Sequence, residues 1–341
     1  MASTSTKAAG TKSILTPSIT LDMHGSRIAS ISYFPDGQRM IGGSDDKTTR
    51  QWDVKAGKEI EEARAVCEGS VREVAVSRNS RWVVSGGELG ELKACEGETG
   101  IVKTFKGHSQ TINCIDISAD NMRLASGSDD FTARIWNLDT GELVAGPFNT
   151  IDWVGAVRFS PNSKKLAVRS WTGRCLEVRD VQSQKLDVKV GGFGLSAGTR
   201  SPVFWTNNNK NIISAFCFTE SEEDDVTTIY VFDASTLESV GTPFEGHTKV
   251  ITGLAFSFDQ TLLASTSDDE TIKLWAFESR QLLASFDVQH IYRLVFSPDS
   301  HQLAYTTYIA DDRKICICDI PPDILAQARV HTLHKHVLFV C

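Results

Sequence analysis

Hydrophobic and polar residues alternate along most of this chain in runs of five to seven. Gly, Asp, Asn or Ser separates the runs, which are rich in β-branched side chains. A period of two is typical of strands that bury one side, and the separating residues favour tight turns. The pattern is clear between residues 103 and 138, where it predicts strands at 103–108, 111–118, 123–128 and 132–138.

The alternating pattern repeats along the chain. A strand-like run that ends in F-S-P-D, or in a worn version of it, recurs at intervals of 40 to 51 residues, anchored on Tyr33, Val76, Ile117, Phe159, Trp205, Phe256 and Phe296. Four short strands per unit make a small sheet that cannot bury both of its faces alone, so neighbouring units must stack. No helical stripe of three turns occurs in the repeats, which excludes α/β enzyme folds of the Rossmann or barrel type.

Two further motifs mark the repeat unit. A histidine lies nine residues before its anchor in three units, and a tryptophan closes the matching strand: His24 with Trp52, His108 with Trp136, and His247 with Trp275. With these motifs the chain resembles the WD40 family of β-propellers. The ending DIPPDILAQAR is also similar to that of stand-alone WD40 proteins of filamentous fungi. The resemblance implies an all-β fold, a seven-bladed β-propeller of four-stranded antiparallel sheets, with the ring closed by the N-terminal strand.

The expected domain organisation follows from the repeats. We expect a disordered N-terminal tail at 1–12, a seven-bladed WD40 propeller at 13–320 and a short C-terminal tail at 321–341. The last unit ends one strand short at Lys314–Ile320. By resemblance to the family, residues 17–23 would supply that strand and leave no open sheet edge.

A constellation of Ser, His and Asp invites comparison with a hydrolase triad. The resemblance implies instead that Trp, Ser, His and Asp form a structural chain of hydrogen bonds, here His108, Ser126, Asp130 and Trp136, repeated as His247, Ser265, Asp269 and Trp275. Two copies of a triad in one domain would be odd, which favours the structural interpretation. The first unit keeps His24, Asp46 and Trp52 but has Gly42 in place of the serine. The second and fourth units lack the motif, and we expect apolar packing to stabilise them.

Composition narrows the choice of partner and compartment. The 341 residues are 41% hydrophobic and carry a net charge of −8, which makes nucleic acid an improbable main partner. No apolar run is long enough for a membrane helix, so we expect no membrane association. Eight scattered cysteines without a secretion signal suggest reduced thiols in the cytoplasm or the nucleus. The glycine-rich stretch at 191–194 and the acidic run at 220–225 lack the spacing of phosphate or calcium sites, so we expect no metal and no cofactor.

Partner-binding positions come from the resemblance. In WD40 propellers three positions per unit reach the face on which partners usually dock. Mapped onto this chain, they give the candidate residues Trp153, Trp171, Arg27, Arg72, His290, Tyr292 and Asp311. Trp, Tyr and Arg are the residues that most often dominate interface energies. Two long connections, 191–200 and 220–225, should emerge on the same face, and they suggest a site over blades four to six.

We therefore expect a non-catalytic scaffold that binds a protein or peptide on the top face of the propeller. Two alternatives remain at this stage. The chain could be a propeller enzyme that uses the central channel, or a reader of modified chromatin peptides with an acidic or aromatic cage at the channel mouth. The sequence does not identify the partner.

Overall fold

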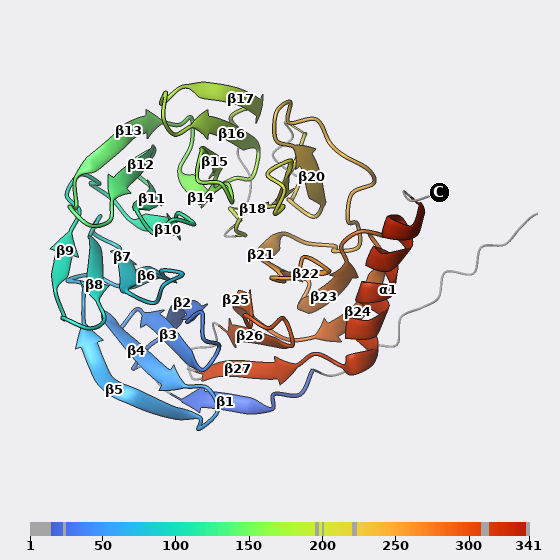
Figure 1. Ribbon diagram of the computed structural model, residues 1–341, viewed down its shortest axis with the longest axis horizontal. Helices are drawn as coiled ribbons and strands as arrows, with labels where there is room; N and C mark the ends of the chain where they lie inside the picture. Colours follow the sequence, from blue (N-terminus) through green and yellow to red (C-terminus); the bar gives the residue numbers. More distant parts are fainter. Residues whose placement is uncertain are drawn as a thin grey trace, which may run out of the picture.

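The computed structural model describes residues 15–22, 25–194, 198–199, 201–219, 224–307 and 314–338. Its strands form seven antiparallel sheets arranged in a ring (Figure 1). This is a seven-bladed β-propeller, and the predicted fold class is confirmed. The tail expected at 1–12, His24, Asp311 and the acidic residues 220–223 lie outside the described residues.

Blades one to four each contain four strands in sequence order, counted outward from the central channel. Blade one comprises β2 (Ile28–Tyr33), β3 (Arg39–Ser44), β4 (Thr48–Asp53) and β5 (Lys58–Ala65). Blade two comprises β6 (Val71–Val76), β7 (Trp82–Gly87), β8 (Leu92–Glu96) and β9 (Val102–Thr104). Blade three comprises β10 (Ile112–Ile117), β11 (Arg123–Ser128), β12 (Thr132–Asn137) and β13 (Leu143–Asn149). Blade four comprises β14 (Val154–Phe159), β15 (Lys165–Ser170), β16 (Cys175–Asp180) and β17 (Leu186–Gly191).

Blades five to seven depart from this plan at two points. Blade five has three described strands, β18 (Phe204–Trp205), β19 (Asn211–Ala215) and β20 (Ile229–Asp233). Blade six comprises β21 (Ile251–Phe256), β22 (Leu262–Ser267), β23 (Thr271–Ala276) and β24 (Leu282–Asp287). Blade seven comprises β25 (Ile291–Phe296), β26 (Gln302–Thr307), β27 (Lys314–Asp319) and, as its fourth strand, β1 (Ile19–Asp22). Strand β1 runs antiparallel to β27, with Leu21 opposite Ile315, and its blue ribbon lies beside the red one in Figure 1.

The core consists of seven apolar clusters, one at each junction between neighbouring blades. Between blades three and four, for example, Ala133 and Phe148 pack with Val154 and Val157. A single blade would leave these side chains in water, whereas stacking removes them at about 25 cal/mol per Å² of apolar surface. The repeat therefore folds only as an array of stacked blades.

The recurring S-P-D motif builds the turn between the first two strands of a blade. In blade three, Ser118 Oγ donates to Asp120 Oδ1 at 2.5 Å and accepts from the Arg123 N–H at 2.9 Å, while Asp120 also accepts from the Met122 N–H. Equivalent pairs start at Ser77, Ser160, Thr206, Ser257 and Ser297. The polar side chains satisfy turn donors that no strand can reach, so the motif is structural.

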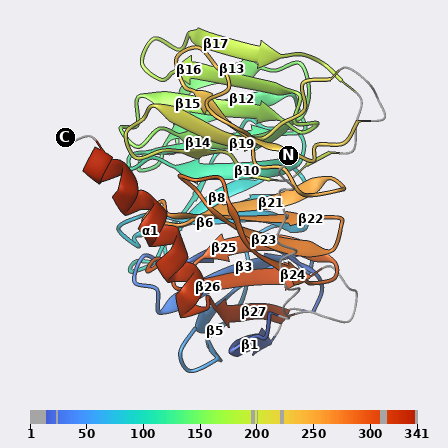
Figure 2. The ribbon, with the colours of Figure 1, turned by 90° about the vertical axis from the view of Figure 1, so that its right-hand side faces the viewer.

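The segment expected as a short C-terminal tail forms a helix, α1 (Pro322–Leu338). Pro322 suits a first helical turn, and Asp323 is favoured there by the helix dipole. Ile324 and Ala328, one turn apart, are buried in the cluster of blades six and seven, and α1 contacts β23 and β24. Figure 1 and Figure 2 show the helix along the outer edge of the ring, beside β24. It was missed because the apolar positions in DILAQAR are too few to make a helical stripe of three turns.

Candidate functional site

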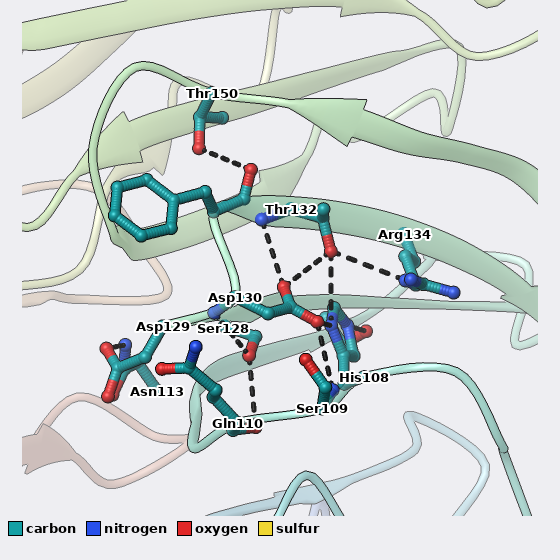
Figure 3. Close-up of polar contacts among 12 residues, drawn as sticks. His108, Ser109, Gln110, Asn113, Ser128, Asp129, Asp130, Thr132, Arg134 and Thr150 are labelled. Atoms are coloured by element: carbon teal, nitrogen blue, oxygen red, sulfur yellow. Dashed lines mark hydrogen bonds and ion pairs between the residues drawn. The ribbon is translucent and has the colours of Figure 1, made fainter.

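We call the face that carries the turns between second and third strands, and the loops between blades, the upper face. In blade three this face holds the predicted hydrogen-bonded chain. Trp136 Nε1 lies 2.9 Å from Ser126 Oγ, which lies 2.8 Å from His108 Nε2, and His108 Nδ1 lies 2.8 Å from Asp130 Oδ2. Figure 3 shows His108 and Thr132 converging on Asp130. Thr132, which donates to Asp130 Oδ1 at 2.6 Å, was not among the predicted members.

The direction of these hydrogen bonds follows from the donors. The indole N–H can only donate, so Ser126 Oγ accepts from it. When the His108 ring is neutral with its proton on Nδ1, the Nδ1–H donates to Asp130 and Nε2 accepts from the Ser126 hydroxyl. Burial lowers the pKa of His108, although Asp130 opposes the shift. Burial alone would raise the pKa of Asp130, but hydrogen bonds from Thr132 and His108 outweigh it and the pKa is lowered.

Blade six contains a second copy of the same network. Trp275 Nε1 to Ser265 Oγ is 2.9 Å, Ser265 Oγ to His247 Nε2 is 2.7 Å, and His247 Nδ1 to Asp269 Oδ2 is 2.9 Å. In both copies the His side chain is 1% exposed. Each Ser and His therefore has its polar atoms engaged inside the blade, where they stabilise the loop against the turn.

Blade one keeps part of the network. Asp46 Oδ2 accepts from the Gly25 N–H at 2.8 Å, and Asp46 Oδ1 accepts from the Thr48 hydroxyl at 2.6 Å. Trp52 is fully buried between blades one and seven. Gly42, at the serine position, lies opposite Arg50 in the sheet and supplies no hydroxyl.

Blades two and four tie the loop to the turn with other residues. In blade two, Glu91 accepts from the backbone N–H groups of Glu68 and Gly69 at 2.8 and 3.2 Å. In blade four, Asp152 accepts from the Thr172 N–H at 3.1 Å and from its hydroxyl at 2.8 Å. Apolar packing was expected to stabilise these blades, and in addition a carboxylate outside the motif takes the place of the missing one. Glu91 lies two residues after the usual Asp position, and Asp152 lies two residues after the usual His position.

A cavity of about 270 Å³ opens on the upper face. Residues from blades two, three, four and seven line it: Arg72, Glu88, Thr111, Asn113, Asp129, Trp153, Trp171, Tyr292 and Arg293. Four of the seven partner-binding candidates are among them. Arg293 was not predicted, because its position in β25 faces the channel one residue beyond the mapped one.

Basic and acidic side chains alternate on one side of the cavity, so that each charge lies beside an opposite charge. Arg27 Nε lies 2.9 Å from Asp45, Asp45 lies 3.2 Å from Arg72, and Arg72 lies 3.0 Å from Glu88. The Arg27 guanidinium also stacks over Tyr292, 4.7 Å from the ring centroid. Arg27 therefore contacts Asp45 and Tyr292 but does not itself line the cavity.

Deeper in the channel, Arg293 pairs with Glu73 at 2.5 Å. Glu73 also accepts from Ser30 Oγ at 2.8 Å. Burial raises the pKa of Glu73, although Arg293 and Ser30 act against the shift. The Arg293 Nε–H donates to the Ala29 carbonyl at 2.7 Å, and its guanidinium carbon lies 5.7 Å from the centroid of the Tyr292 ring.

Two tryptophans from blade four form the opposite side of the cavity. Trp153 is 42% exposed and Trp171 is half-buried. The Trp171 N–H donates to the Trp153 carbonyl at 2.7 Å. A Cβ at Gly155 would lie 2.7 Å from Trp171 Cα, so only glycine permits this close approach of turn and strand.

Other candidates lie elsewhere. His290 is half-buried in the turn before β25 and does not line the cavity. Of the acidic stretch, Asp224 and Asp225 are described, and neither lines it; the Asp224 carbonyl accepts from Arg174 at 2.9 Å. The cavity thus lies over blades two, three, four and seven, whereas the long connections pointed to blades four to six.

Comparison with known proteins agrees with this architecture. Residues 15–53, 100–137 and 237–276 match the family described as "WD domain, G-beta repeat". These segments contain the three units in which the His and Trp motifs were found. The chain thus contains WD40 repeats in these three segments.

Curated WD40 relatives are similar at low identity. They include cell division cycle 20.1, cofactor of APC complex, from Arabidopsis thaliana, at 23% identity over 75% of this chain and 56% of that protein. Eukaryotic translation initiation factor 3 subunit I from Culex quinquefasciatus is 25% identical over 54% of this chain and 57% of that protein. WD repeat-containing protein SL1-17 from Schistosoma mansoni is 27% identical over 61% of this chain and 65% of that protein. The chain spans a little over half the length of the first two.

The described residues contain no group of three His, Cys, Asp or Glu side chains placed to hold a metal ion. Within the same residues, no helix has the length and apolar character to cross a membrane. The cysteines among them are free thiols, and burial raises the pKa of Cys67 to about 11, with Glu91 adding to the shift.

Proposed function

We propose that this protein is a non-catalytic WD40 scaffold that binds a protein or peptide partner on its upper face. The cavity between blades two, three, four and seven carries the proposal. It combines the exposed indole of Trp153 with the guanidinium of Arg72, the residue types that most often dominate binding energies. The names of two relatives, a cofactor of a complex and a subunit of an initiation factor, also describe parts of larger assemblies.

The state of the polar side chains supports a non-catalytic role. General acid–base catalysis needs a group that can reach the substrate. His108 and His247 are buried, and both ring nitrogens of each contact partners inside the blade. In the cavity, Arg72 and Arg293 are engaged by carboxylates, which suits recognition better than proton transfer.

The nature of the partner and the compartment are part of the proposal. A net charge of −8 favours a basic protein or peptide over nucleic acid. Free thiols are expected in a reducing compartment, so we place the protein in the cytoplasm or the nucleus.

Crosslinking affinity purification from native cells tests the proposal. Wild type, Trp153→Ala and Met122→Ala would be compared, because Met122 is a 58% exposed apolar residue on the opposite face of blade three. We expect partners captured by wild type and by Met122→Ala to be depleted with Trp153→Ala. Equal recovery of every partner with all three proteins would place binding elsewhere.

A further inference from the structure

The upper face of blades two to four exposes large apolar side chains around the cavity. The exposed fractions are 61% for Leu89, 44% for Phe131, 38% for Ile151 and 42% for Trp153. We call these four residues the apolar rim. The turns of blades one and six carry the polar Lys47 and Glu270 at the place of Phe131. Phe193 and Phe218, in the upper-face connections of blades four and five, are also exposed, at 62% and 50%.

Members of the apolar rim lie on successive connections that contact one another. The Thr111 hydroxyl in the loop before blade three donates to the Glu88 carbonyl, next to Leu89, at 3.1 Å. The Thr150 N–H, next to Ile151, donates to the Phe131 carbonyl at 2.9 Å. Figure 3 shows Thr150 above the turn that carries Asp130. The turns and loops that carry the rim residues are therefore hydrogen-bonded to one another on the upper face.

Phe131 is an unusual choice for its position. Its backbone has a φ of +63°. At the same place in the turn, blades two and four have Gly90 and Gly173, and blades one and six have the polar Lys47 and Glu270, with φ of +73° and +63°. The left-handed region is unfavourable for a bulky side chain. Because the ring is 44% exposed, it adds little to the core. Its presence is better explained by contact with something outside the chain.

The cavity inside the rim contains one carboxylate that no cation neutralises. Asp129 Oδ1 accepts from Asn113 Nδ2 at 2.7 Å, and no Lys or Arg of the described residues forms an ion pair with it. Arg72, in contrast, lies between Asp45 and Glu88, and Arg293 is held by Glu73. A carboxylate beside an exposed indole attracts a cation by charge and by cation–π interaction.

We infer that the upper face recognises a peptide segment in which a basic side chain is flanked by apolar residues. The basic side chain enters the cavity toward Asp129 and contacts Trp153, and the apolar neighbours cover Leu89, Phe131 and Ile151. The cavity of about 270 Å³ lies below the roughly 300–1,000 Å³ of most small-molecule sites, so it suits a single side chain. This inference rests on the proposed function and specifies its ligand.

Selection of a phage-displayed library of random peptides on the full-length protein tests the inference. We expect enriched peptides to share a Lys or Arg between apolar residues. Synthetic versions with Gln in place of the basic residue should bind about tenfold more weakly, which corresponds to the loss of an ion pair with cation–π contact. Asp129→Asn, which can still accept from Asn113, should weaken wild-type peptides equally and leave the Gln peptides unaffected.

Phe131→Gly separates binding from folding. Glycine relieves the positive φ, so the melting temperature should not fall, yet binding should weaken about tenfold because apolar contact is lost. Met122→Ser, on the opposite face of the same blade, is the matched control and should bind normally.

The outcomes distinguish this inference from the proposed function. Peptides without a basic residue that still require Trp153 would overturn the inference and keep the proposed binding face. Peptides that bind Trp153→Ala and Asp129→Asn as well as wild type would overturn both. Failure of the library to yield any binder would overturn the inference that the ligand is a short linear segment.

Discussion

In blades three and four, a carboxylate links the loop that precedes the blade to the turn between its second and third strands. The carboxylate comes from the turn in blade three and from the loop in blade four. In blade three, Asp130 stands in the turn and accepts from His108 and from the Ser109 N–H of the loop at 2.8 and 3.1 Å. In blade four, Asp152 stands in the loop and accepts twice from Thr172 of the turn. In both blades the carboxylate accepts from a backbone N–H that makes no hydrogen bond within the sheet. A blade can therefore lose the histidine and still keep a link between loop and turn.

The exchange changes which side chains the upper face presents. Trp153 of blade four occupies the place of Thr111 in blade three, and Trp171 occupies the place of Asp129. All four residues line the same cavity. The blade that keeps the family motif thus contributes polar groups, and the blade that lost it contributes the aromatic surface. A degenerate repeat is here the more informative place to look for recognition.

The two blades also meet their next neighbours differently. A Cβ at Gly127 in blade three would lie 2.3 Å from Val154, because blade four packs closely against it. The equivalent residue in blade four is Arg169, fully buried, whose Nη2 donates to the carbonyls of Thr199 and Ser201 at 3.0 and 2.6 Å. The guanidinium thus contacts the backbone that precedes β18, the two-residue first strand of blade five.

The largest effect on stability should come from the histidine of blade three. His108→Ala leaves Ser126 and Asp130 without their buried partner, so we expect the free energy of unfolding to fall by about 2–3 kcal/mol. The matched change in blade four, Thr150→Ala, should cost less than about 1 kcal/mol, because it removes only partly exposed hydrogen bonds. Denaturant titration measures both. Similar losses for the two variants would contradict the distinction between the blades.

A smaller but clear loss should follow from removing the carboxylate of blade four. Asp152→Ala deprives the Thr172 N–H and hydroxyl of their acceptor, and we expect a loss of about 1–2 kcal/mol. Asp152→Asn, which retains an acceptor oxygen, should recover part of it. A loss for Asp152→Ala no larger than about 0.3 kcal/mol, the scale of an ordinary surface substitution, would mean that apolar packing alone holds this blade.

The fold could be predicted because its determinants are local and repeated. Alternation, S-P-D turns and the His and Trp positions each recur in several units, so worn copies could be recognised by register. Helix α1 could not be predicted in the same way, because Ile324 and Ala328 are buried by strands that are distant in the sequence. Nor could the roles of Glu91 and Asp152, since a carboxylate two residues away from the motif has no signature of its own.

The site was predictable in part for the same reason. Trp153, Trp171, Arg72 and Tyr292 were found by transferring family positions, and they line one cavity. The lengths of connections were a poor guide to its location, because loop length says nothing about where neighbouring blades leave a hollow. Leu89, Phe131 and Ile151 were missed because an isolated apolar residue in a turn carries no sequence signal, and its exposure appears only in three dimensions.

Lowering the pH should weaken blades three and six more than blade four. Burial lowers the pKa of His108 and of His247 below the ordinary 6.5, so the unfolded chain takes up protons that the folded chain resists. Their contribution is present above that value and is lost as the pH falls through it. We expect wild type to unfold at lower denaturant at about pH 5.5 than at about pH 7.5. The double variant His108→Gln/His247→Gln should show a smaller difference, and an equal difference would show that other groups cause it.

The smallest effect on stability should come from Trp153, the residue that most distinguishes the surface of blade four. Its indole is 42% exposed, and its backbone carbonyl, which accepts from Trp171, is unchanged in Trp153→Ala. We therefore expect the free energy of unfolding to stay within about 0.5 kcal/mol of wild type, as for most surface substitutions. Binding of a partner to the upper face should nevertheless fall by about tenfold or more, because exposed tryptophans at the centre of an interface commonly contribute 2 kcal/mol or more. Calorimetry of unfolding and of partner binding on the same preparation measures the two quantities together. A variant destabilised by about 2 kcal/mol would assign Trp153 to the scaffold, and blade four would then differ from blade three in composition without differing in role.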